Sequence, residues 1–230
     1  MTLADDVYRQ IRADILACRI APGTKLRINE FCERFGVSLG AVREALSKLS
    51  ADGLVVAEAQ KGYQVAPVSR DELVDLTQTR IEIECLCLRD AIATGDLEWE
   101  SRIVASFHRL TRIDEHDKTD TARLSDAWIV AHSEFHSALV SACRSEVKLR
   151  IRHALYEQTE RYRRLSVPVR GKAKRDVNGE HRALMSAALK RNTELACSLM
   201  AKHLGKTADI LLSASFLDTS VPAASRKNSR

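Results

Sequence analysis

The stretch VSLGAVREALSKL, Val37 to Leu49, decides the fold of the first part of this chain. Its apolar residues recur at the spacing of one helical face and so predict an amphipathic helix: Val42, Ala45, Leu46 and Leu49. Ser38 stands where a helix cap is expected, and the small residues Gly40 and Ala41 follow it. Arg43 lies one turn in. A helix with a slim leading end and an arginine behind it is suited to close contact with another molecule.

The residues that flank this helix predict further short elements. A helix is predicted over residues 5–20 and a shorter one over 27–36, with Gly36 as its C-terminal cap. Pro22-Gly23 marks a turn between them. After Gly53, two short β-runs within residues 54–68 surround Gln60-Lys61-Gly62 and predict a hairpin. Helix, helix, tight turn, helix and hairpin predict a winged helix-turn-helix over residues 1–68.

A winged helix-turn-helix places the N-terminal end of its second helix in the major groove of DNA. Arg43 would then reach a base edge or a phosphate, and Ser38 could donate to a phosphate. Lys61 and Gly62 at the wing tip could approach the minor groove. The alternative is a small helical domain with solvated charges, but the complete order of elements, wing included, favours DNA binding.

Composition agrees with a mainly helical, intracellular protein. The 230 residues allow one large or two modest domains, and 45% hydrophobic but only 5% aromatic residues suit helices better than a β-sandwich. The N-terminus has acids where a signal peptide needs bases, and no apolar run approaches the length of a membrane span. The six cysteines form no CxxC pair, so reduced thiols in the cytoplasm are expected. A net charge of +5 permits nucleic-acid binding without demanding it.

The second part of the chain is predicted to be an antiparallel bundle of six to seven helices. Six helical patterns separated by breakers cover residues 71–93, 97–116, 121–143, 145–166, 174–192 and 193–212. The fold class is therefore mostly α, with a bundle domain over residues 69–215. The polar stretch 216–230 has no periodicity and is expected to be a disordered tail.

The positions of the histidines in the bundle indicate a candidate metal site. His132 and His136 are four residues apart, hence on one helix face, and His181 and His203 belong to two later helices. Imidazoles that converge from three helices suit a zinc-like divalent ion. Taken singly, each could equally be a core histidine satisfied by a neighbour, which is the reading for His108, His116 and His153.

The first part of the chain resembles the DNA-binding domain of the GntR family of bacterial transcription regulators. The resemblance covers IAPGTKLRINEFCERFGVSLGAVREALSKLSADGLVVAEAQKGYQVAPVS, residues 20–69, including the gVS, VReAL and GL motifs and the wing glycine. It implies a homodimer that reads a short palindromic operator in double-stranded DNA, with contacts from Ser38, Arg43 and Gly62. Leu39 stands where the family commonly has a base-reading arginine, and leucine cannot donate a hydrogen bond. A different operator sequence is therefore expected.

The second part resembles the FCD ligand-binding domain of the FadR-type branch of that family. Many members hold a metal through an Asp-x-x-Phe-His motif and two later histidines; here the matching residues are HSEFH (132–136), His181 and His203. His132 replaces the usual acid. Four neutral ligands would leave the metal its full charge and favour a bound anion, although the replacement could equally mark a weakened site. Zinc is the expected ion, with nickel or manganese as alternatives.

A small carboxylate is the expected effector. The family often uses an arginine at the position of Arg80 to hold a carboxylate, although Arg80 could instead form a surface salt bridge with Glu84. Tyr156 and Arg163 share a helix face that could line the cavity, while most of the basic stretch 161–175 is expected to be solvated loop. The HxxFH variant followed by RYR is similar to regulators of glutarate and other small-carboxylate catabolism.

A metal-dependent hydrolase of helical fold is the alternative function. His116-Asp117 is a doublet found in helical phosphohydrolases, but it lies in a polar stretch, and no nucleophile or base has a suitable spacing beside the histidine cluster. The sequence therefore favours a regulator, a repressor rather than an activator, over an enzyme.

Overall fold

A computed structural model describes residues 2–58, 61–121, 123–169 and 175–213. The described residues divide into two compact units, one through Glu72 and one from Leu73 to Ser213. The stretch 216–230, expected to be a disordered tail, lies outside the described residues.

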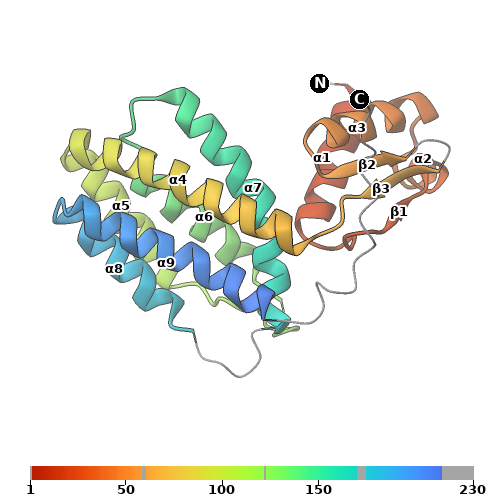
Figure 1. Ribbon diagram of the computed structural model, residues 1–230. Coiled ribbons are helices and arrows are strands. Elements are labelled where there is room, and N and C mark those ends of the chain that lie inside the picture. Colours follow the sequence, from red (N-terminus) through yellow and green to blue (C-terminus); the bar gives the residue numbers. More distant parts are fainter. Residues whose placement is uncertain (1, 59–60, 122, 170–174, 214–230) are drawn as a thin grey trace, which may run out of the picture. The chain divides into compact units, whose positions relative to one another are not determined.

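The first unit is a winged helix-turn-helix, as predicted (Figure 1). Its elements are α1 (Leu3–Leu16), β1 (Lys25–Leu26), α2 (Ile28–Phe35), α3 (Leu39–Ala51), β2 (Val55–Glu58) and β3 (Gly62–Val65). The antiparallel sheet has the order β1-β3-β2, with Lys25 opposite Gln64 and Val55 opposite Val65. The sequence pattern marked residues 21–26 only as a turn. It missed β1 because a two-residue strand is too short to show periodicity.

The turn between α2 and α3 is set by local chemistry. Gly36 ends α2 with a left-handed φ of 64°, a conformation that costs glycine little. Ser38 then caps α3 by accepting a hydrogen bond from the Ala41 N–H at 3.4 Å. The apolar face of α3 packs on α1 and the sheet, in a core made of Val7, Ile11, Ile15, Leu26, Phe31, Val42, Ala45, Leu46, Leu49, Leu54, Val55 and Val65. This packing leaves the opposite face of α3 to solvent.

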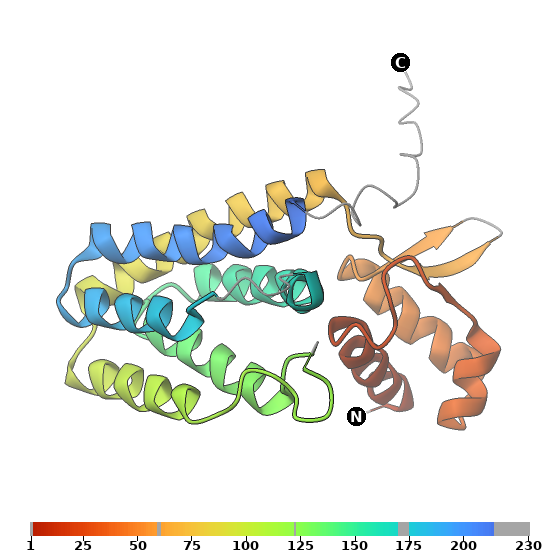
Figure 2. The same ribbon diagram turned by 90° about the horizontal axis from the view of Figure 1, so that it is seen from below.

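The second unit is the expected bundle of six helices. They are α4 (Arg70–Thr94), α5 (Leu97–Thr111), α6 (Asp126–Val140), α7 (Glu146–Val169), α8 (Val177–Leu189) and α9 (Thr193–Leu212). Helices α4 and α9 lie side by side in both Figure 1 and Figure 2. The Arg89–Glu194 ion pair joins them near the end of α4 and the start of α9, so they run antiparallel. Trp99, Phe135 and Leu139 belong to the apolar core that α5, α6 and their neighbours enclose.

Two expectations about the bundle were wrong. Helix α5 ends at Thr111, five residues earlier than the pattern indicated, and a non-helical connection leads to α6. Helix α7 continues through Pro168, and Arg161 and Tyr162 within it are buried. The first part of the basic stretch 161–175 is thus helical core rather than solvated loop: Arg161 is buried, and Arg163 and Arg164 form ion pairs with Glu160.

All six cysteines are free thiols. Among the described residues, none of the helices is long and apolar enough to cross a membrane.

Candidate metal centre and nucleic-acid interface

The four histidines singled out by the sequence lie together in the bundle interior. Helix α6 supplies His132 and His136, α8 supplies His181 and α9 supplies His203, and all four are buried. One nitrogen from each ring can be chosen so that all four lie within 4.8 Å of one another. In a tetrahedral zinc site with Zn–N bonds of about 2.0–2.1 Å, ligand atoms are roughly 3.4 Å apart. A small inward movement of the rings would therefore satisfy such an ion.

The hydrogen bonding of the rings fits a metal centre. Both nitrogens of His136 and both nitrogens of His181 are buried and have no hydrogen-bond partner among the described residues. Burying a polar atom without a partner costs free energy, so such atoms need an explanation. A divalent ion coordinated by one nitrogen of each ring would supply a partner that the protein itself does not.

The electrostatic setting keeps these rings in the form that binds metal. Burial lowers the pKa of His132, His136 and His181 well below 6.5, and the nearby cationic groups lower it further. Burial also lowers the pKa of His203, although its hydrogen bond with Glu180 opposes that shift. Because a neutral imidazole is the ligand and an imidazolium is not, the cluster is ready for a metal at neutral pH.

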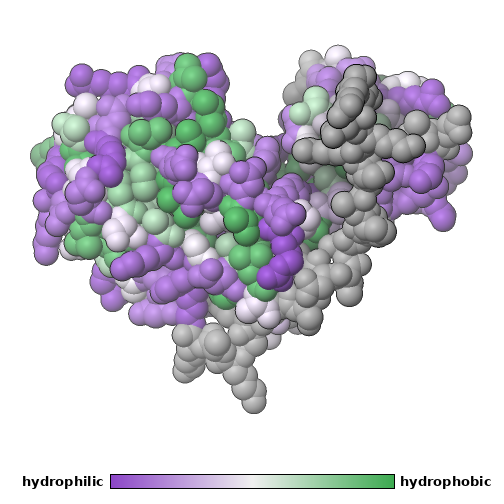
Figure 3. Space-filling view, viewed as in Figure 1, coloured by the Kyte–Doolittle hydropathy of each residue, from purple (hydrophilic) through white to green (hydrophobic). Residues whose placement is uncertain are grey.

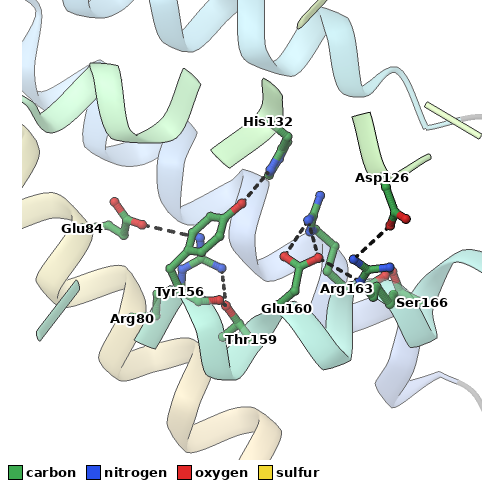
Figure 4. A network of polar contacts seen from close by, with 10 residues as sticks. Arg80, Glu84, Asp126, His132, Tyr156, Thr159, Glu160, Arg163 and Ser166 are labelled. Carbon is green, nitrogen blue, oxygen red and sulfur yellow. Dashed lines mark hydrogen bonds and ion pairs between the residues drawn. The ribbon is translucent and has the colours of Figure 1, made fainter. Parts of the chain in front are cut away.

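Two of the rings have partners outside the cluster. His132 Nδ1 lies 3.2 Å from the Tyr156 hydroxyl (Figure 4), and His203 Nδ1 lies 2.8 Å from a Glu180 carboxylate oxygen. Glu180 in turn accepts hydrogen bonds from Arg175 and from Lys206. The sequence patterns did not identify Glu180 or Arg175, because residue order alone does not show that α8 presents Glu180 to a histidine on α9.

A small cavity of about 30 Å³ adjoins the cluster. Its walls include His132 and His203 on one side and Arg80 and Arg163 on another. Apolar residues, threonines and a tyrosine complete the lining: Leu73, Leu204, Ala208, Thr77, Thr159, Thr207 and Tyr162. The cavity thus brings two guanidinium groups and two of the four histidines to a single space.

The two arginines of this cavity are held in place by neighbours but are not saturated. Arg80 donates to Thr159 Oγ1 at 2.6 Å, and its other Nη lies 3.4 Å from a Glu84 oxygen (Figure 4). Arg163 donates to Glu160 at 2.6 Å. Arg80 Nε and Arg163 Nη1 are buried and have no partner among the described residues. Each arginine therefore retains an N–H for an anion.

The salt-bridge alternative for Arg80 needs one correction. The Arg80–Glu84 pair exists, but it is buried rather than on the surface, since Glu84 is fully enclosed and also accepts from Arg152 at 2.8 Å. Tyr156 is buried beneath the Arg80 guanidinium, whose carbon lies 4.9 Å from the ring centre, and its hydroxyl is directed to His132.

The His116-Asp117 doublet lies in the connection between α5 and α6, away from the histidine cluster. The Asp117 carboxylate accepts from the backbone N–H groups of Thr119 at 2.7 Å and of Asp120 at 3.1 Å, as in a turn. The Thr119 hydroxyl also donates to this carboxylate, and that hydrogen bond, together with the two from the backbone, lowers the pKa of Asp117. Among the described residues, the group suited to a metal ion contains histidines alone.

The leading end of α3 in the first unit is exposed. Ser38, Leu39, Gly40 and Arg43 all lie at its surface. Among the described residues Arg43 has no hydrogen bond or ion pair, whereas Lys48 on the same helix pairs with Asp5 at 2.8 Å. An unpaired guanidinium needs no internal bond to be broken before it contacts another molecule.

At the wing, Lys61 and Gly62 directly follow residues 59–60, which lie outside the described part of the chain. Gly62 has a φ of 92°, which glycine adopts without strain, and Lys61 lies 3.5 Å from Glu58. Both are exposed, as a contact with the minor groove would require.

Comparison with known proteins agrees with this division of the chain. Residues 3–65 match the family model "Bacterial regulatory proteins, gntR family", and residues 75–206 match the FCD domain. The uncharacterized HTH-type transcriptional regulator BphR of Paraburkholderia xenovorans is 41% identical over 91% of this chain and 85% of its own length. The HTH-type transcriptional repressor GlaR of Escherichia coli is 35% identical over 86% of this chain and 91% of its own.

Solved structures share the fold. Escherichia coli McbR/YncC aligns with a TM-score of 0.72 at 16% identity, over 92% of this chain and 98% of that one. A putative GntR transcriptional regulator from Rhodococcus aligns with a TM-score of 0.70 at 24% identity and the same coverage. With a winged helix, an FCD-type bundle and relatives that match nearly their whole length, the chain belongs to the GntR family of bacterial transcriptional regulators, in the group whose second domain is an FCD domain.

Proposed function

We propose that this protein is a homodimeric, cytoplasmic repressor whose operator binding is modulated by a small carboxylate bound near a divalent metal. Its first 68 residues act as the DNA-binding domain and residues 69–215 as the dimerising, effector- and metal-binding domain. The relative named as a repressor supports that sign of regulation. Zinc is the proposed ion, with nickel and manganese as alternatives, because imidazole nitrogens suit all three and geometry decides among them.

DNA reading is assigned to the exposed end of α3. Arg43 contacts a base edge or a phosphate, Ser38 donates its hydroxyl hydrogen to a phosphate, and Gly40 allows close approach of the backbone. Leu39 is 44% exposed at the first position of the helix. An apolar side chain in the major groove is matched by the thymine methyl group rather than by a guanine edge. Lys61 and Gly62 add contacts from the wing.

The effector is assigned to the cavity beside the histidines. A bound divalent ion supplies a fixed positive charge that holds one carboxylate oxygen. The Arg80 and Arg163 N–H groups that lack partners bind and orient the anion. Tyr156 positions His132 from behind. Small dicarboxylates, glutarate among them, are the first compounds to test.

A dimer face is assigned to α4 and α7. Leu86 on α4 and Val147 and Ile151 on α7 are large apolar side chains that remain 45–56% exposed. Apolar residues gather on the bundle face over α4 and the start of α7 in Figure 3. Such residues are costly in water, and a second copy of the chain would cover them.

The observation that carries this proposal is a cluster of four buried imidazoles, two of which line one cavity together with the guanidinium groups of Arg80 and Arg163. The test begins with a duplex selected from random DNA by the purified protein. Release of that duplex is then followed by fluorescence anisotropy across a panel of small carboxylates. In Arg80→Ala, DNA affinity should stay near wild type while release by the active compound is lost. A variant that loses both properties, or neither, would contradict the effector assignment.

A further inference from the structure

We propose that Glu180 is a positioning residue for the metal centre: it fixes the ring of His203 so that Nε2 faces the ion, and it supplies the negative charge that the four-histidine set lacks. This inference rests on the metal centre of the proposed function. It adds a residue that does not itself coordinate the ion and that controls how tightly the ion is held.

The contact between Glu180 and His203 joins two helices. Glu180 lies on α8, directly before the candidate ligand His181, and its carboxylate reaches across to His203 Nδ1 on α9 at 2.8 Å. The Glu180 side chain is only 14% exposed and that of His203 only 7%. A short contact between two such shielded groups is a directed hydrogen bond.

The neighbours of this contact show which atom carries the proton. Arg175 Nη2 donates to the Glu180 carboxylate at 2.7 Å and to the His203 backbone carbonyl at 2.7 Å. Its two hydrogens are therefore engaged, and it has none left for His203 Nδ1, although that atom is 3.3 Å away. Nδ1 must then be the donor to Glu180. The neutral ring consequently has its lone pair on Nε2, which is the nitrogen left to bind a metal.

Glu180 is itself held firmly. Its second oxygen accepts from Arg175 Nε at 3.0 Å and from Lys206 Nζ at 2.8 Å. Both carboxylate oxygens of Glu180 therefore accept charge-assisted hydrogen bonds, which fix the position of the side chain beside His203.

The other three rings lack such a partner. His132 has the neutral hydroxyl of Tyr156, and His136 and His181 have no hydrogen-bond partner among the described residues. Among the described residues, the carboxylate that hydrogen-bonds to a ring of this set is that of Glu180, behind His203. Carboxylates that hold the second nitrogen of a metal-binding histidine raise its basicity and commonly change metal affinity 10- to 100-fold when removed.

The test compares zinc affinity in three full-length proteins by competition with a chromophoric chelator. Glu180→Gln keeps the size of the side chain and an acceptor oxygen but removes the charge; it should weaken zinc binding about 10- to 100-fold. Lys206→Met is the matched control, since it removes an outer ion pair of Glu180 and leaves the bond to His203. Its zinc affinity should remain within about threefold of wild type.

A purely structural role for Glu180 predicts a different pattern. The metal-free Glu180→Gln protein would then melt at a lower temperature while the folded protein kept wild-type zinc affinity, and that result would overturn the inference. If wild type itself binds no zinc, the proposed metal centre is wrong. If wild type binds zinc and Glu180→Gln binds it equally well, only the role of Glu180 is wrong.

A measurement on wild type covers the case in which the variant does not fold. In ¹⁵N-labelled protein loaded with ¹¹³Cd, the spin coupling between metal and nitrogen should appear at His203 Nε2, with a slowly exchanging proton on Nδ1. Coupling to Nδ1 instead would overturn the inference, because Glu180 would then face an unprotonated, metal-bound nitrogen.

Discussion

At the scale of single residues, the leading end of α3 presents two contrasting side chains to solvent. Leu39 and Arg43 are exposed on α3, one apolar and the other a cation without an internal partner. A leucine in this place costs little in the folded protein because the core of the unit is complete without it. The presence of Leu39 is therefore better explained by contact between α3 and bound DNA than by a role in the stability of the fold.

Replacing Arg43 by alanine should weaken operator binding by about 1–3 kcal/mol, because a charge-assisted contact is lost. Fluorescence anisotropy with the selected duplex measures the change. Arg9→Ala on α1 removes the same charge from the same unit and should have a much smaller effect. Equal losses in the two variants would mean that total charge, and not the position of Arg43, determines affinity.

If Leu39 packs against a thymine methyl, replacing one thymine in each half-site by deoxyuridine should weaken binding about fourfold per half-site. That factor corresponds to roughly 0.8 kcal/mol for one buried carbon group. In Leu39→Ala the two duplexes should bind alike, whereas Leu3→Ala on α1 should still distinguish them. If no thymine position in the duplex responds to the loss of its methyl group, Leu39 does not read the base.

At the scale of the elements, the sequence predicted which residues share a helix face but not how the helices pack against one another. The i, i+4 spacing is enough by itself to place His132 and His136 on one face of α6. The meeting of that face with His181 and His203 depends on how α6, α8 and α9 pack, which no local pattern encodes. For the same reason the alternative reading of Arg80 placed its pair with Glu84 at the surface: an i, i+4 pair looks identical in the sequence whether solvent or α7 covers it.

Removal of one histidine tests the joint site. His136→Ala should lose most of the bound zinc, measured as metal per chain after dialysis, and a chelator should lower the melting temperature of wild type much more than that of the variant. His132→Asp should keep its zinc, because a carboxylate can serve as a ligand in the same place. His153→Ala, a histidine exposed on α7, is the control and should behave as wild type. Zinc retained by His136→Ala would show that the four rings do not share an ion.

The lowered pKa values of the buried histidines also predict a pH dependence for the metal-free protein. Each ring resists protonation in the folded state but protonates near pH 6.5 when unfolded. The unfolded state therefore binds more protons below that pH. Stability present above pH 6.5 should fall as the pH is lowered toward 5, by about 1.4 kcal/mol per pH unit for each extra proton.

Urea unfolding of the metal-free protein at pH 7, 6 and 5 measures this slope, and His136→Phe should reduce it by removing one such ring. The Glu180 pKa is also lowered, but a carboxylate of this kind loses its contribution only below about pH 4.5, outside the window. Stability that stays constant from pH 7 to 5 would mean that the rings titrate alike in the folded and unfolded protein, as they would if water reached them.

At the scale of the whole molecule, the sequence predicted the order and type of the elements well. The recognition helix and the six bundle helices were recognisable because each has a long or well-capped apolar pattern. The limits of α5 and α7 were missed, since polar residues near a helix end do not show whether the chain continues against the core. The surface proposed to join two copies of the chain also has no periodic signature, and it must be inferred from what remains exposed.

That surface gives the last prediction. If Leu86, Val147 and Ile151 meet a second copy, Ile151→Asp places a charge in an apolar interface and should convert the dimer to a monomer at about 10 µM, as measured by analytical ultracentrifugation. Val104→Asp, an equally exposed apolar position on α5, should leave the dimer intact. Because a monomer meets one half-site at a time, Ile151→Asp should also lose most of its affinity for a palindromic duplex while its metal content stays unchanged. A dimeric Ile151→Asp protein would move the interface to another face of the bundle, and a monomeric wild type would remove the basis for reading a palindrome.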